Sequence, residues 1–150
     1  MSGRVEAIWK KRSRGGLMDS VEQVNAIANK GLEDDANFGA TRQVTVIEQE
    51  VFDRIKEELP ESEPGMRRAN IMVSGLKLRN MRNHVLVVGE AEILLRGETR
   101  PCELMDEQCR GLQDALDPNW YGGAHGGVIR GGAIRVGDAA SMELPSAVLS

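Results

Sequence analysis

The chain has 150 residues, 41% of them hydrophobic, which is enough for one domain that folds around its own core without a metal or a disulfide. Its formal net charge of -4 opposes binding to nucleic acid, because such proteins usually carry an excess of positive charge. No apolar run approaches the length of a transmembrane helix, and the first residues do not resemble a signal peptide. We therefore expect a cytoplasmic protein that does not bind membranes.

The first third of the chain predicts a strand, a helix and a loop. Residues 4–9 alternate in polarity as a strand does. Its residues on one side would be Val5, Ala7 and Trp9. Ser20 is a suitable N-cap for a helix over 21–30, where apolar residues recur at helical spacing. Residues 31–43 show no periodicity and predict an irregular loop.

The middle of the chain predicts two strands with a helix between them. Residues 43–48 are rich in β-branched side chains and predict a strand. Apolar residues at helical spacing over 49–59 predict a helix, which Pro60 ends. Residues 67–74 predict a second strand that begins with two arginines.

The second half predicts two hairpins separated by a helix. Residues 84–89 and 91–97 form a predicted hairpin, and its second strand leads into a helix over 106–116. The glycine-rich stretch 117–127 predicts irregular structure. Within 128–138, Gly131 and Gly132 separate two short β-branched runs, which is a hairpin signal.

Six or seven short strands with three helices favour a mainly β fold over a parallel doubly wound sheet. We expect a closed or nearly closed β-barrel with peripheral helices, since closure leaves no strand edges unpaired. The domain would cover residues 1–138. Residues 139–150 lack a clear pattern and predict a frayed tail.

Cys102 is the main candidate for chemistry, because Arg100 lies two residues before it and a predicted helix follows. Positive charge or a helix N-terminus favours the thiolate, the form that acts as nucleophile or metal ligand. Burial as a small apolar residue is an equal alternative for Cys102, and it is the favoured interpretation for Cys109. A zinc site that combines both cysteines with His84 and His125 has no familiar ligand spacing.

Four arginines lie at the starts of predicted strands or just before the thiol. Arg42 enters one strand, Arg67 and Arg68 enter another, and Arg100 precedes Cys102. The planar guanidinium matches phosphate and carboxylate oxygens, so convergence of these side chains would suit a large anion or an oxyanion-bearing metal centre. Separate surface charges are an equal alternative. His125 could be a general base, but a solvated side chain is the simpler expectation for a glycine-rich loop.

The segments GLEDDANFGATRQVTVIE, RRANIMVSGLKL, VLVVGEAEILLRGETRPCELM and GGVIRGGAIRVGD, in this order, resemble a MOSC domain over residues 4–138. The resemblance implies a barrel like that of the pyruvate kinase barrel domain. It also implies that Cys102 is the catalytic residue and metal ligand, either carrying sulfur as a persulfide or binding the molybdenum of the pterin cofactor. The family's Gly-Asp-Arg-His loop keeps only its aspartate here, as Asp35. The implied cofactor-binding residues are Arg42, Arg67, Arg68, Asn70, Arg100 and Asp35.

By this resemblance, we expect a protein that binds the molybdenum cofactor or carries sulfur for metal-sulfur or molybdopterin delivery. One alternative is a molybdenum-dependent reductase of N-hydroxylated compounds, and another is a non-catalytic barrel that binds an anion or a protein. The chain contains no pyridoxal-phosphate desulfurase domain. A partner protein would therefore be needed. It would be either a cysteine desulfurase or another sulfur donor, or an electron-donor protein.

Overall fold

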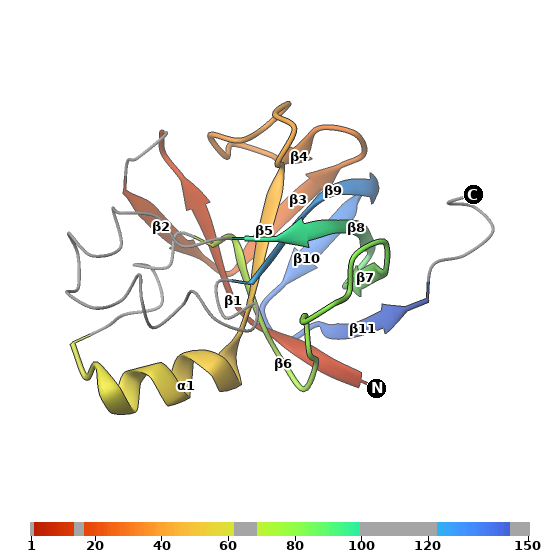
Figure 1. Ribbon diagram of the computed structural model, residues 1–150. Coiled ribbons are helices and arrows are strands. Elements are labelled where there is room, and N and C mark those ends of the chain that lie inside the picture. Colours follow the sequence, from red (N-terminus) through yellow and green to blue (C-terminus); the bar gives the residue numbers. More distant parts are fainter. Residues whose placement is uncertain (1, 14–16, 62–68, 100–122, 145–150) are drawn as a thin grey trace.

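The computed structural model of the protein is mainly β and describes residues 2–13, 17–61, 69–99 and 123–144. Figure 1 shows the strands crossing one another around a common interior, with a helix at one side. The strands are β1 (Ser2–Lys11), β2 (Met18–Val21), β3 (Gln23–Ile27), β4 (Gly31–Leu32), β5 (Val44–Glu48), β6 (Ile71–Ser74), β7 (Val85–Val88), β8 (Ala91–Glu98), β9 (Ala124–Arg130), β10 (Gly132–Arg135) and β11 (Ala139–Glu143). The helix is α1 (Gln49–Glu58).

The main sheet closes on itself. Its order is β11-β7-β8-β9-β5-β6-β1-β2, and β11 also pairs with β1, so seven strands form a closed barrel and β2 extends it from β1. β5 and β6 pair in parallel, whereas the other pairs within the barrel are antiparallel. A second sheet contains β10, β3 and β4. The predicted β-barrel is thus confirmed.

Aliphatic side chains fill the barrel. Ile71 and Val73 of β6 and Ile93 and Leu95 of β8 are fully buried in one core cluster. They alternate with residues that face outward, as the two-residue period of a strand requires. Barrel closure therefore gives one side of each strand a shared apolar interior and leaves the other side available for polar groups.

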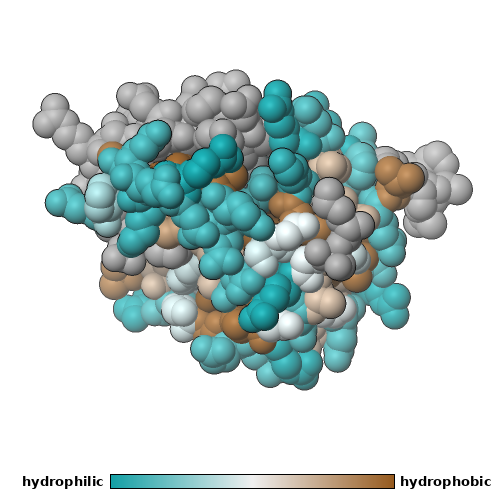
Figure 2. Space-filling view, turned by 90° about the horizontal axis from the view of Figure 1, so that it is seen from below, coloured by the Kyte–Doolittle hydropathy of each residue, from teal (hydrophilic) through white to brown (hydrophobic). Residues whose placement is uncertain are grey.

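A smaller apolar cluster lies outside the barrel, where α1 packs against β5 and β6. It contains Trp9, Ile47, Phe52, Ala69 and Met72. The helix predicted over 49–59 is confirmed to within one residue. Figure 2 views the molecule from below and shows hydrophobic surface only as small separate areas within a mostly hydrophilic face.

The first strand is confirmed, but its predicted face is wrong. The register between β1 and β6 shifts between Val5 and Ala7, as a β-bulge does. Val5 consequently packs in the barrel interior, whereas Ala7 and Trp9 belong to the outer cluster. An extra residue at a bulge reverses the face of everything that follows, and simple alternation could not predict this.

The helix predicted over 21–30 is wrong, because this stretch contains the end of β2 and all of β3. Val24 and Ala26 are buried while their neighbours in β3 are exposed, which is a two-residue period. β3 pairs with β10 on one side and β4 on the other. Pairing with these distant strands therefore determines the conformation of residues 23–27, although their local spacing of apolar residues is helical.

Three expectations for the C-terminal third also need correction. Residues 124–127, predicted to be irregular, begin β9. Gly131 and Gly132 do not join a hairpin: β9 stays in the barrel and β10 pairs with β3. Residues 139–143, assigned to a frayed tail, form β11 and close the barrel. The hairpin of β7 and β8 is confirmed, whereas the helix predicted over 106–116 lies outside the described residues.

The closed interior can be tested with two isoleucines on neighbouring strands. Ile93 is fully buried inside the barrel, and Ile129 is 37% exposed. We expect Ile93→Ala to lower the free energy of unfolding by about 2–5 kcal/mol, because it removes buried contacts and leaves a cavity. The control Ile129→Ala should cost about 0.5 kcal/mol or less. Urea unfolding measures both, and equal losses would contradict the assignment of the interior.

Candidate functional site

Four residues lie side by side across neighbouring elements and form what we call the polar row: Gly97, His125, Thr45 and Asn70. Gly97 of β8 is paired with His125 of β9, which is paired with Thr45 of β5. Asn70 precedes β6, and its backbone N–H donates to the carbonyl of Thr45 at 2.9 Å. Ala124 and Val128 of the same strand belong to the core, and by alternation along the strand His125 points away from the barrel interior.

Asn70 holds one end of the polar row rigidly. Its side chain is fully buried, and Nδ2 donates to the Trp9 carbonyl at 3.2 Å and to Asp35 Oδ1 at 3.0 Å. Its Oδ1 accepts from the N–H of Thr45 at 3.1 Å. Both amide hydrogens are therefore used within the protein. This placement favours a positioning role for Asn70 over direct contact with a ligand.

Asp35 anchors the loop before β5 to the same point. It is 5% exposed, and Oδ1 also accepts from the Lys11 N–H at 2.7 Å. Oδ2 accepts from the Asn37 N–H at 3.0 Å, and Asn37 Nδ2 donates to the Arg42 carbonyl at 3.0 Å. The predicted residues Asp35, Asn70 and Arg42 are thus linked by one chain of hydrogen bonds.

The other end of the polar row is positively charged. A side chain at Gly97 would place its Cβ 3.2 Å from His125 Nε2 and 3.6 Å from Arg82 Nη2, so these two groups converge above Gly97. A Cβ at Gly127 would lie 3.3 Å from Arg96 Nη2. Burial lowers the pKa of His125, and the charges of Arg42, Arg82 and Arg96 lower it further. We call His125 and these three arginines the basic cluster.

The three arginines of the basic cluster have no carboxylate within 4.0 Å among the described residues, unlike Arg4, Arg12, Arg130 and Arg135. Two polar side-chain atoms, His125 Nδ1 and Thr99 Oγ1, are buried and have no hydrogen-bond partner in the described part of the structure. Guanidiniums without a carboxylate partner are suited to bind an anion.

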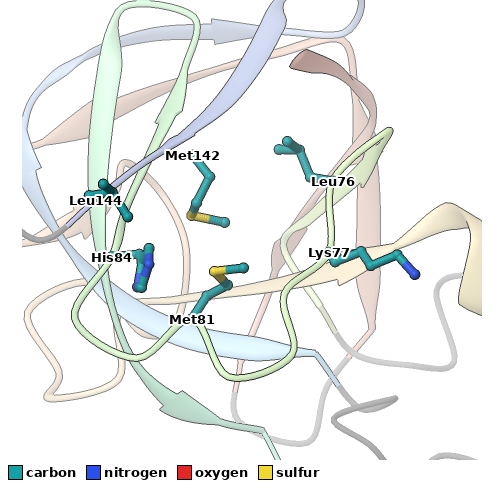
Figure 3. A pocket seen from close by; sticks show the side chains of 6 residues that line it. All are labelled: Leu76, Lys77, Met81, His84, Met142 and Leu144. Carbon is teal, nitrogen blue, oxygen red and sulfur yellow. The ribbon is translucent and has the colours of Figure 1, made fainter. Parts of the chain in front are cut away.

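The loop that carries Arg82 also lines a cavity of about 170 Å³. Its lining residues are Leu76, Lys77, Met81, His84, Met142 and Leu144. Figure 3 shows Met81 and Met142 pointing toward each other across this cavity. The cavity has a mostly apolar wall and shares no lining residue with the polar row.

The remaining predicted site residues, Arg67, Arg68, Arg100 and Cys102, lie outside the described residues. The chain nevertheless leaves and re-enters the described structure beside the polar row. Thr99, three residues before Cys102, donates its N–H to the Gly123 carbonyl at 2.9 Å. In the described ranges, no group of three or more His, Cys, Asp or Glu side chains is placed to hold a metal ion, and no helix could cross a membrane.

Sequence reasoning missed Arg82 and Arg96 and treated His125 as a solvated loop residue. Alternation within β8 is a signal that could have placed Arg96 on the polar side, but nothing in the sequence pairs it with residues of β9. His125 lies in a strand instead, partly buried between β8 and β5. The register between these strands, together with the bond from the Asn83 N–H to the Leu95 carbonyl, brings the three side chains together.

Comparisons with known proteins agree with this fold. The sequence model of the MOSC domain matches residues 33–141. The structure of the YuaD protein from Bacillus subtilis has a TM-score of 0.80 at 20% identity, covering 95% of this chain and 96% of that chain.

Two structures of YiiM are also similar to this chain. YiiM from Escherichia coli has a TM-score of 0.69 at 19% identity, covering 93% of this chain and 69% of that chain. For YiiM from Geobacillus stearothermophilus the TM-score is 0.72 at 16% identity, with 93% and 74% covered. No curated protein matches the sequence.

The bond between Asp35 and Asn70 can be measured by a double-mutant cycle. Each single change to Ala leaves buried hydrogen-bonding groups without partners, and we expect each to lower the free energy of unfolding by about 1–3 kcal/mol. The double variant should lose less than the sum, by about 0.5–3 kcal/mol. Asp34→Asn is the control, because that side chain is 79% exposed and asparagine tolerates the φ of 65° at this position, so the change should matter little. Strict additivity would show that the two side chains do not act together.

The lowered pKa of His125 predicts a loss of stability in acid. Protonation is harder in the folded state than in the unfolded chain, so the stabilisation is present above the unfolded pKa of about 6.5 and is lost as pH falls below it. From about pH 7.5 to about 5.5, the free energy of unfolding should fall more in the wild type than in His125→Gln. Urea unfolding at both pH values measures this, with His84→Gln as the control for loss of a histidine elsewhere. Equal falls in wild type and His125→Gln would contradict it.

Proposed function

This chain belongs to the MOSC domain family, which is associated with molybdenum cofactor binding, and from that premise we propose that it binds the molybdenum cofactor with the Cys102 thiolate as a metal ligand. The observation that carries the proposal is the position of the basic cluster. It lies where β8 ends, and the chain reaches Cys102 four residues after the last residue of that strand.

The residues present fit an anionic pterin cofactor. The guanidiniums of the basic cluster lack carboxylate partners in the described structure, and His125 Nδ1 and Thr99 Oγ1 are buried without a hydrogen-bond partner there. Arg42 would contact the cofactor, and Arg67, Arg68 and Arg100 would add positive charge around it. The cofactor would supply a redox-active metal ion, for which a thiolate is a suitable soft ligand.

Asp35 and Asn70 would act by positioning. Their hydrogen bonds hold the loop before β5 and the start of β6 against β1, and Asn37 continues this link to the backbone of Arg42. A ligand at the polar row would then meet side chains whose backbones are already fixed. Such preorganisation reduces the entropy lost on binding.

Metal and pterin analysis tests the proposal. The protein is produced in a host that makes the cofactor and purified as wild type, Cys102→Ser and, as the matched control, Cys109→Ser. We expect molybdenum and pterin in the wild type and in Cys109→Ser, and loss of at least 90% of the molybdenum, about tenfold, in Cys102→Ser, because the thiolate ligand is gone.

Mass spectrometry of the same samples distinguishes the sulfur-carrier alternative. A persulfide on Cys102 without molybdenum would favour sulfur transport from a donor such as a cysteine desulfurase. The absence of both molybdenum and persulfide from the wild type would contradict the whole proposal.

A further inference from the structure

We propose that Met81, Met142 and His84 form a binding site for the soft monovalent metal ion Cu(I). All three side chains line the cavity of about 170 Å³, which shares no residue with the polar row. Figure 3 shows Met81 and Met142 turned toward each other, with His84 beside them. Two thioether sulfurs and one imidazole nitrogen are a donor set suited to Cu(I), because thioethers select this ion and imidazole also binds copper. The site is independent of Cys102 and goes beyond the proposed function.

The fold holds Met81 and His84 at the two ends of one tight turn. The His84 N–H donates to the Met81 carbonyl at 3.0 Å, and the Met81 N–H donates to the Leu78 carbonyl at 3.2 Å. The His84 carbonyl in turn accepts from the Leu95 N–H of β8 at 3.0 Å. Because Leu78 and Leu95 are both fully buried in the barrel core, the turn is anchored at each end.

The register between β7 and β11 brings Met142 to the same place. Met142 is paired with Leu86, which lies two residues after His84 in the chain. Residues that are diagonal in this way across an antiparallel pair share a face, and long side chains reach each other there. Met142 and Met81 both pack against the barrel core. Since methionine has three rotatable bonds, their sulfurs can close on an ion smaller than the cavity.

A hydrogen bond to the backbone leaves one ring nitrogen of His84 free to bind a metal ion. His84 Nδ1 donates to the Arg82 carbonyl at 3.3 Å. A carbonyl oxygen only accepts, so this bond places the hydrogen on Nδ1 and leaves the lone pair of the neutral ring on Nε2. Histidines that bind metals commonly make such a bond through their other nitrogen, which fixes the tautomer and the orientation of the ring.

The wall of the cavity favours a soft monovalent ion over hard or divalent ions. None of the described residues that line it is a carboxylate, the side chain that Ca²⁺ and Mg²⁺ use as a ligand. Lys77 carries a positive charge, but Figure 3 shows its side chain pointing away from Met81 and Met142. The three donors are neutral, and the cost of burying an ion beside them rises with its charge. A single positive charge is therefore the best fit.

Competition with a chromophoric Cu(I) chelator in the absence of oxygen measures the affinity. The reference protein is the full chain with Cys102→Ser and Cys109→Ser, because free thiols would also bind Cu(I). We expect saturable binding of one Cu(I) per chain, and at least about tenfold weaker binding after Met81→Leu, Met142→Leu or His84→Gln. Loss of a group that only orients a ligand already weakens metal binding by about 10- to 100-fold, so loss of a ligand should cost no less.

Met18→Leu, made in the same reference protein, is the matched control. Met18 packs against the outer cluster and does not line the cavity, so this change should alter the affinity by less than about twofold. Exchange of Met for Leu conserves volume and apolar character, and equal urea midpoints verify that each variant folds. A tight Cu(I) complex that is equally weakened by Met18→Leu would overturn the inference.

NMR of methionine methyl groups labelled with ¹³C identifies the ligands directly, without relying on the variants alone. One equivalent of Cu(I) should shift the signals of Met81 and Met142, which the Leu variants assign, and leave the signal of Met18 in place. Shifts confined to other methionines, or no competition with the chelator by the reference protein, would show that the cavity is not a Cu(I) site.

Discussion

The buried side chain of Asn70 is the constraint on which the arrangement of the site depends. It joins β1, β5, the start of β6 and Asp35, which are far apart in sequence, through three hydrogen bonds in a region closed to water. Such a fully hydrogen-bonded buried side chain favours this one packing arrangement, because any other would leave buried donors or acceptors without partners. Asp35 extends this order into the loop before β5, and Asn37 extends it to the backbone of Arg42. One end of the polar row is therefore rigid, and the buried side chain of Asn70 has its hydrogen-bond partners within the protein.

The other end of the polar row has the opposite character. Around His125, three guanidiniums are gathered without a carboxylate among the described residues, and two buried polar atoms are left without partners. Neutralising or separating these charges would lower the free energy of the fold, so their convergence supports the proposal that this face binds an anion. Barrel closure by β11 makes this gathering of positive charge possible. The shared aliphatic interior stabilises the strands whichever side chains they present on the outer face.

Local signals predicted the elements that are stabilised locally. β7 and β8 are joined by a short turn, and β5 leads directly into α1, so sequence neighbours supply most of what defines them. The helix predicted over 21–30 and the hairpin predicted at Gly131 fail together, for one reason. β3 and β10 are each other's partners across more than a hundred residues, and neither period nor turn signals report such pairing. β11 was missed similarly, because its partners β1 and β7 lie far upstream.

The sequence by itself determined the family and a mainly β barrel, and it named Asp35, Asn70 and Arg42 as candidates, because ordered motifs and alternating apolar residues are properties of the chain. Only the tertiary structure decided that Asp35 and Asn70 bond each other, and that Arg82, Arg96 and His125 converge. The physical reason is strand register: a bulge at Arg96 and the pairing of Gly97 with His125 fix which side chains meet, and register is set by contacts between distant segments.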